Sequence, residues 1–123
     1  MRALVVDDST PIRMYLRKVL TSNGFEVAEA RNGREGLEQL RSKQIDLVLL
    51  DWNMPVMNGL ELLRYIRSEP GLGRPCVMMV TTETDLSEVS QALECGANEY
   101  VMKPFTPEII LDKLALMGFT VEA

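Results

Sequence analysis

The sequence predicts a doubly wound α/β domain with one parallel sheet of five strands in the order 2-1-3-4-5. Two observations lead to this fold class. Segments of strand type and of helix type alternate five times along the 123 residues, with short connections between them. Right-handed crossovers between parallel strands place helices on both faces of such a sheet. The length suits one core, so we expect a single domain over residues 1–123.

The first two strand–helix units follow from apolar periodicity and from turn residues. Ala3–Val6 is a continuous apolar run, which is typical of a strand buried on both faces. A helix follows in which Ser9 is the expected N-cap, and Asn23-Gly24 ends it. Alternation over 25–30 predicts a strand near the sheet edge, and Asn32-Gly33 leads into the second helix. The first helix has its apolar positions at helical spacing, namely Ile12, Tyr15, Leu16, Val19 and Leu20.

The third and fourth units carry the same signals. Leu47–Asp51 predicts the third strand, which is apolar up to its last residue. Asn58-Gly59 leads into the third helix, which is expected to end near Pro70-Gly71. Val77–Thr81 predicts the fourth strand. A helix ending before Gly96 follows, with apolar positions Leu86, Val89 and Leu93.

The fifth unit begins with the short strand Tyr100–Met102. Thr106 is the expected N-cap of the last helix, and Gly118 closes that helix. The side chains expected to be at least partly buried are Ile109, Ile110, Leu114 and Met117.

Composition and charge exclude several classes of function. The net charge of −5 and the pI of about 4.8 argue against a nucleic-acid partner, which would need a basic stripe. The chain has no His, so imidazole metal sites and Ser–His or Cys–His pairs are excluded. The apolar runs are too short for a membrane span and no signal peptide precedes the first strand, so we expect a cytoplasmic protein. Cys76 and Cys95 lack metal-ligand spacing and are interpreted as small buried apolar residues in a reducing compartment.

Four of the predicted strands end at a polar residue capable of chemistry. Asp7 and Asp8 follow the first strand, and Asp51 ends the third. Thr81 ends the fourth strand, and the fifth leads into Lys103. The carboxyl ends of parallel strands meet at the edge of the sheet where ligands bind. Asp7 or Thr81 alone would fit a turn or a helix cap, but the combination predicts one site.

The expected side chains suit phosphoryl transfer. Three close carboxylates repel one another, and a divalent cation removes the conflict. Mg²⁺ suits a site of carboxylate oxygens and waters that also takes a phosphate oxygen. Lys103 adds a positive charge and Thr81 a hydroxyl donor, which completes a set of metal, cation, donor and carboxylate nucleophile.

At this point the chain resembles a known family, the receiver domain of two-component response regulators. The resemblance covers the whole chain and implies the flavodoxin-like or CheY-like fold. It is carried, in family order, by Val5–Ser9, Leu50–Pro55, Asn58-Gly59, Thr81 and Lys103–Phe105.

The resemblance implies the role of each acidic residue. Asp51 would be the phosphoacceptor, taking the phosphoryl group from a phosphohistidine of a sensor histidine kinase. Asp8, Asp51 and the backbone carbonyl of Asn53 would ligate Mg²⁺, and Asp7 would act through water. The domain would then be no enzyme beyond catalysing its own phosphorylation and dephosphorylation.

The resemblance also implies a switch. Thr81 and Lys103 would bind the phosphoryl oxygens, and the Lys103–Pro104 bond would be cis, which X–Pro bonds tolerate. Tyr100 matches an aromatic residue that turns inward when the threonine moves. The surface that changes would be the last strand with its flanking helices.

Three positions beside the site are expected to tune it. Asn53 and Glu83 match positions that adjust hydrolysis in the family. Thr82 is a departure, because the family usually has a smaller residue there. Its β-branched side chain is expected to narrow access to the phosphoryl group.

Within the family, the chain resembles single-domain chemotaxis regulators. This likeness is carried by Asp51–Pro55, by Gly59–Leu63 and by Gly96–Tyr100. The chain ends at Ala123, after the last helix, so we expect no output domain. The implied partners are a sensor histidine kinase and the flagellar motor switch, and we expect a monomer without nucleic-acid or membrane partners.

Other functions stay open at this point. A phosphorelay intermediate or phosphate sink would accept phosphoryl groups without a motor target. A phosphatase of the haloacid dehalogenase type also uses an Asp nucleophile and Mg²⁺, but it carries Asp-x-Asp on the first strand, with a cap domain. A flavin-binding module is disfavoured because no phosphate-cradling loop follows the first strand.

Overall fold

The computed structural model describes residues 1–82 and 86–119, and of Leu86 only the backbone. It contains a five-stranded sheet in the order β2-β1-β3-β4-β5, in which every neighbouring pair is parallel. The predicted fold class and strand order are therefore confirmed. The strands are β1 (Arg2–Val6), β2 (Glu26–Ala30), β3 (Leu47–Asp51), β4 (Cys76–Thr81) and β5 (Glu99–Met102).

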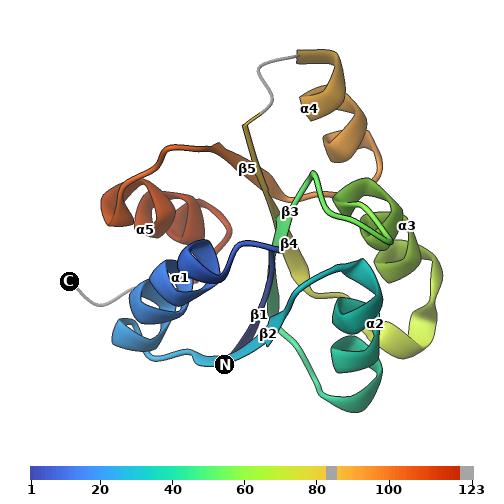
Figure 1. The fold of residues 1–123 in the computed structure, drawn as a ribbon, viewed down its shortest axis with the longest axis horizontal. Coiled ribbons are helices and arrows are strands. Elements are labelled where there is room, and N and C mark those ends of the chain that lie inside the picture. The colour runs from blue at the N-terminus through green and yellow to red at the C-terminus, as the bar shows by residue number, and fades with distance from the viewer. Residues whose placement is uncertain (83–85, 120–123) are drawn as a thin grey trace.

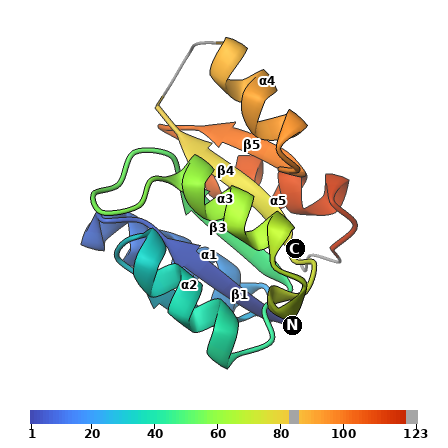
Figure 2. The same cartoon turned by 90° about the vertical axis from the view of Figure 1, so that its right-hand side faces the viewer.

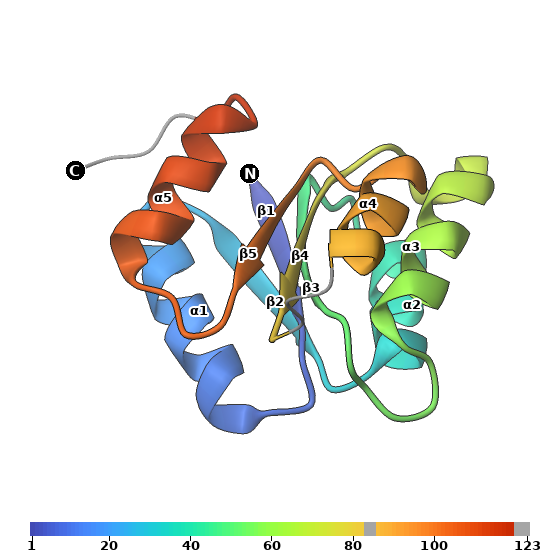
Figure 3. The same cartoon turned by 90° about the horizontal axis from the view of Figure 1, so that it is seen from above.

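Helices cover both faces of the sheet, which runs between two helical layers in Figure 1. Figure 3 shows α1 and α5 on one face, with α2, α3 and α4 on the other. Figure 2 shows the second layer from outside, with α2, α3 and α4 lying along the strands. The helices of the described residues are α1 (Thr10–Ser22), α2 (Gly33–Ser42), α3 (Gly59–Ser68), α4 (Leu86–Glu94) and α5 (Pro107–Leu116), with a 3₁₀ turn at Pro70–Leu72.

Polar caps start the helices where the sequence predicts them. The Ser9 side chain accepts a hydrogen bond from the Ile12 amide, and Asn32 and Thr106 cap α2 and α5 in the same way. Asn58 and Glu61 form a reciprocal capping box at the start of α3. Because α1, α2 and α3 begin shortly after strands, these caps also fix the loops at the carboxyl edge of the sheet.

The sheet divides the core into two layers, and successive residues of each strand point alternately into one layer and the other. Leu4 and Val6 of β1 pack toward α2, α3 and α4, whereas Ala3 and Val5 pack toward α1 and α5. β3 is buried along its whole length and lies at the centre of the sheet. Truncating a fully buried leucine there, such as Leu50, would cost about 2–5 kcal/mol. The strand that ends in Asp51 is thus rigidly held.

Several predicted helix faces differ from those observed. Tyr15 and Leu93 are 36% and 43% exposed, although each lies at an apolar position of its helix, whereas Ile109 is partly buried as expected at 41% exposure. Arg13 is buried on α1, where its guanidinium contacts the Asp7 carbonyl and Glu29 of β2. An arginine with partners for its guanidinium can occupy a position at the edge of a core.

The two cysteines are free and half-buried, which corrects the prediction that they are buried. Cys76 starts β4 and Cys95 follows α4, so each lies at the margin of a core layer. Over the described part of the chain, no helix is both long and apolar enough to cross a membrane.

Candidate functional site

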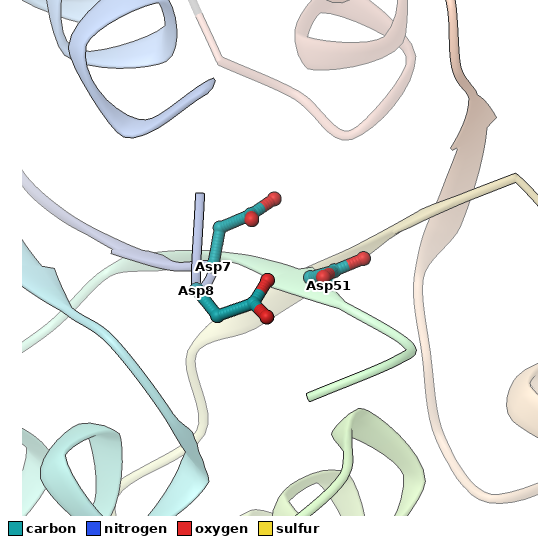
Figure 4. A group of neighbouring side chains, drawn as sticks. All are labelled: Asp7, Asp8 and Asp51. Atoms are coloured by element: carbon teal, nitrogen blue, oxygen red, sulfur yellow. The ribbon is translucent and has the colours of Figure 1, made fainter. Parts of the chain in front are cut away.

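The ends of β1 and β3 bring three carboxylates together. These strands are neighbours with Val6 opposite Leu50, so Asp7 follows β1 beside Asp51 at the end of β3. Asp7, Asp8 and Asp51 each offer an oxygen within 4.8 Å of the others. Figure 4 shows the three side chains gathered at the carboxyl edge of the sheet. The predicted convergence of the acidic residues is confirmed.

Asp7 is buried, and both of its carboxylate oxygens accept hydrogen bonds. The amide of Ser9 donates to Oδ1 at 2.9 Å, and Nζ of Lys103 donates to Oδ2 at 3.1 Å. Asp8 is exposed. The two neighbouring carboxylates therefore differ in accessibility. That of Asp7 is hydrogen-bonded inside the protein, whereas that of Asp8 faces solvent, where a ligand can reach it.

Lys103 brings one positive charge to the cluster. Its Nζ atom also lies 3.4 Å from Oδ1 of Asp51, and its backbone amide donates to the Thr81 carbonyl at 2.8 Å. The Lys103–Pro104 peptide is cis, as the resemblance implies. Burial lowers the pKa of Lys103, but the carboxylates of Asp51 and Asp7 raise it by more, so its pKa is raised and it stays an ammonium.

The charge of the cluster is not balanced. Burial, together with the Asp7 carboxylate, raises the pKa of Asp51 to about 6, although Lys103 opposes the shift. One ammonium thus compensates only part of the charge of three carboxylates. The donors are oxygens, and the excess charge is negative. The residues present therefore fit a small, hard divalent cation such as Mg²⁺.

The loop after β3 folds back tightly onto its own strand. The amide of Gly59 donates to the Trp52 carbonyl at 2.9 Å, and a Cβ atom at Gly59 would collide with the backbone carbonyl of Asp51. The Asn-Gly pair thus serves two purposes, since Asn58 caps α3 and Gly59 permits the close approach. Asn53 lies in this loop, two residues after Asp51.

Thr81 and Tyr100 lie on the face of the sheet covered by α4. Thr81 ends β4 and is buried, and Tyr100 of β5 is half-buried beside Met79 of β4. A small cavity is lined by both residues and by Trp52. The ammonium of Lys113 lies 4.8 Å above the Tyr100 ring. The two predicted switch residues are therefore neighbours through shared packing.

Thr82 is exposed and directly follows Thr81. It shares with Lys103 and Phe105 an apolar hollow of about 340 Å³ between α1 and the start of α5. Glu83, the other expected tuning residue on this side, lies outside the described residues.

The sequence analysis did not identify Arg13 as part of the site. Its guanidinium donates to the Asp7 carbonyl at 2.7 Å, which places a second cation directly behind the acidic cluster. A signal was present, because Arg13 lies three residues before Leu16 and seven before Leu20, on the apolar face of α1. A charged residue in that register is expected to have a buried partner.

Known proteins resemble this chain over nearly its full length. The family profile described as response regulator receiver domain matches residues 3–115. Chemotaxis protein CheY1 of Helicobacter pylori is 42% identical over 119 residues, which cover 95% of this chain and 96% of the relative. A CheY homolog of Campylobacter jejuni is 42% identical over 116 residues, covering 93% and 89%. The solved structure of Vibrio cholerae chemotaxis protein CheY4 has a TM-score of 0.87 at 35% identity, covering 94% and 96%.

Proposed function

This chain belongs to the response regulator receiver domain family, and we propose that it is a chemotaxis regulator of the CheY type whose phosphoacceptor is Asp51. The observation that carries the proposal is the position of Lys103, whose ammonium contacts both Asp7 and Asp51 while Asp8 stays open to solvent. Acidic residues alone are common on protein surfaces. Three of them at the carboxyl ends of adjacent strands, two of which contact a half-buried lysine, form a site for an anion and a cation together.

Phosphoryl transfer would begin at the Asp51 carboxylate. One of its oxygens attacks the phosphorus of a phosphohistidine on the kinase, and a P–O bond forms as the P–N bond breaks. The imidazole, protonated on its other ring nitrogen, takes the electron pair of the P–N bond and leaves as a neutral group, and the product is an acyl phosphate on Asp51. Hydrolysis by water later returns the free carboxylate, so the domain catalyses only its own phosphorylation and dephosphorylation.

Mg²⁺ would be held by Asp8, Asp51 and the backbone carbonyl of Asn53. Asp7 would act through water, which agrees with the hydrogen bonds that both its oxygens already accept. When bound, the metal supplies positive charge against the phosphoryl oxygens. The raised pKa of Asp51 supports the cation site, because an added positive charge would favour the ionised nucleophile at neutral pH.

Lys103 and Thr81 would bind the phosphoryl oxygens. Lys103 already contacts the Asp51 carboxylate, so it is close to any group attached there. Thr81 would gain a hydrogen bond by moving toward the acyl phosphate, and the shared cavity couples this movement to Tyr100. The ring would turn inward, and the surface of β5 with α4 and α5 would change. Asn53, Thr82 and Glu83 would tune the lifetime of the phosphoryl group.

The proposed partners are a sensor histidine kinase upstream and a flagellar motor switch protein downstream, and the proposed location is the cytoplasm. The protein would act as a monomer with no nucleic-acid or membrane partner. The names of the relatives support the chemotaxis role.

Transfer from a labelled chemotaxis kinase tests the proposal. Phosphoryl label should move to the wild-type chain only with Mg²⁺ present, and Asp51→Asn should accept none. A switch-protein peptide should then bind the phosphorylated chain more tightly than the unphosphorylated one. Equal binding of both forms would favour a phosphorelay intermediate or phosphate sink, and transfer to Asp51→Asn would refute the assignment of the phosphoacceptor.

A further inference from the structure

We infer that Arg13 is a positioning residue for the proposed magnesium site. Its buried guanidinium fixes the peptide unit between Asp7 and Asp8, and so the direction in which Asp8 presents its carboxylate. The inference rests on the proposed function, since it concerns the metal proposed to bind there.

Arg13 connects three elements around the end of β1. Nη1 donates to the Asp7 carbonyl at 2.7 Å, and Nη2 donates to Oγ1 of Thr10 at 3.1 Å. Nε lies 3.3 Å from Oε1 of Glu29 on β2. The side chain of Arg13 is only 10% exposed. A planar group held at three points has one orientation, so it makes a rigid support for the carbonyl.

Every polar group of Asp7 takes part in a hydrogen bond. Its amide donates to the Ala30 carbonyl at 3.1 Å, and its carboxylate accepts from Ser9 and Lys103. Arg13 completes this set at the carbonyl oxygen. Because a peptide unit is planar, the fixed Asp7 carbonyl also fixes the amide of Asp8.

Asp8 depends on that support. Across residues 1–82 and 86–119, no donor is hydrogen-bonded to its carboxylate, and the residue is exposed. Its direction is therefore set by the backbone rather than by neighbouring side chains. Partners that orient metal ligands typically change metal affinity by about 10–100-fold when they are mutated.

A charge effect and a positioning role predict opposite changes in Mg²⁺ affinity when the Arg13 side chain is removed. By Coulomb repulsion alone, a guanidinium close to the cluster opposes a bound cation, so its removal would tighten Mg²⁺ binding. Loss of the fixed Asp7–Asp8 peptide would weaken Mg²⁺ binding. The sign of the change in affinity therefore separates a positioning role from a simple charge effect.

Calorimetric titration of the full chain with Mg²⁺ alone tests the inference. Arg13→Met should bind Mg²⁺ about tenfold more weakly than wild type. The Mg²⁺ affinity of Arg13→Lys should lie between those of wild type and Arg13→Met, because one ammonium cannot contact the Asp7 carbonyl, Thr10 and Glu29 together. Arg17→Met is the matched control, since Arg17 is half-exposed, contacts the same Glu29 at 2.6 Å and removes the same charge. Its affinity should stay within about twofold of wild type.

Two results would overturn the inference. One is Arg13→Met binding as tightly as wild type or more tightly, and the other is Arg17→Met weakening binding as much as Arg13→Met. If Arg13→Met fails to fold by circular dichroism, Arg13→Lys decides by the same criterion. Failure of wild type to bind Mg²⁺ would instead refute the proposed metal site, which keeps the two claims distinguishable.

Discussion

Nζ of Lys103 lies 3.4 Å from Oδ1 of Asp51, although the two residues are 52 positions apart in the sequence. This ion pair joins the proposed nucleophile to the cation that would bind the phosphoryl oxygens. The proposed metal ion and Lys103 would therefore share the Asp51 carboxylate.

The first prediction concerns pH and stability without metal. The pKa of Asp51 is raised to about 6 by burial and by Asp7, so the folded state disfavours the ionised carboxylate. The folded state holds the proton more tightly than the unfolded state. The free energy of unfolding should therefore fall as pH rises from about 4 to about 6, by no more than about 3 kcal/mol.

Urea unfolding in EDTA across this pH range checks the first prediction. Asp51→Asn should lack the fall in the free energy of unfolding that ionisation of Asp51 causes. It should be more stable than wild type at pH 8, and this difference in stability should shrink toward pH 4. Asp112→Asn, which changes an exposed carboxylate of α5, is the control and should follow wild type. A wild-type stability that rises between pH 4 and pH 6 relative to Asp51→Asn would contradict the shift.

The second prediction is that Lys103→Met strengthens Mg²⁺ binding and slows phosphorylation. The variant removes a cation that contacts Asp7 and Asp51, so Mg²⁺ should bind more tightly than in wild type. Phosphorylation by a small phosphodonor should slow by about 100-fold, because a positive charge at the phosphoryl oxygens is lost. Calorimetry measures the Mg²⁺ affinity, and a phosphorylation time course measures the rate. Weaker Mg²⁺ binding than in wild type, or phosphorylation at the wild-type rate, would exclude this role for Lys103.

The third prediction concerns Thr82, which directly follows Thr81. Its exposed side chain lines the hollow beside Lys103, so Thr82→Ala should widen access to the phosphoryl group. Phosphorylation or loss of the phosphoryl group should become faster. Thr82→Val keeps the β-branched shape and should behave like wild type. Unchanged rates in Thr82→Ala time courses would exclude a gating role.

The fourth prediction concerns the contact between the Tyr100 ring and Lys113. The Lys113 ammonium lies 4.8 Å above the ring and donates to Glu99 at 3.0 Å. An inward turn would give up this cation–π contact, which is worth about 0.5–1 kcal/mol. Lys113→Met should therefore raise the inward population of Tyr100 about two- to fivefold before any phosphorylation.

Fluorine NMR of fluorotyrosine-labelled protein measures that population, with Tyr100→Phe to assign the signal. Lys43→Met, at the exposed C-cap of α2, is the control. Identical Tyr100 populations in wild type and Lys113→Met would show that the cation–π contact does not bias the ring.

The strands and the site could be predicted because both depend on short-range patterns. Apolar runs that end in Asp7, Asp51 and Thr81 place chemistry at the strand ends, and parallel pairing then brings those ends together. The outward side of the helices was harder to predict. Tyr15 and Leu93 have apolar spacing yet are partly exposed, and single apolar side chains at a protein surface are common.

The role of Arg13 was harder to predict, because its position on the apolar face of α1 indicates a buried partner without saying which one. Its guanidinium contacts the Asp7 carbonyl and Glu29 of the next strand, and neither contact follows from periodicity. Only the pairing of β1 with β2 brings Glu29 opposite Val5, close to the end of β1. Tertiary structure thus supplies the supporting contacts of a site whose reactive residues the sequence already indicates.

The central claim is that Asp51 is a magnesium-dependent phosphoacceptor, and the fluorescence of Trp52 tests it most directly. Trp52 is the only tryptophan of the chain and follows Asp51. Its intensity should change on adding Mg²⁺ and again on adding a small phosphodonor in wild type, and Asp51→Asn should lose the second step. A second step that persists in Asp51→Asn, or a wild type that responds equally with EDTA present, would contradict the claim.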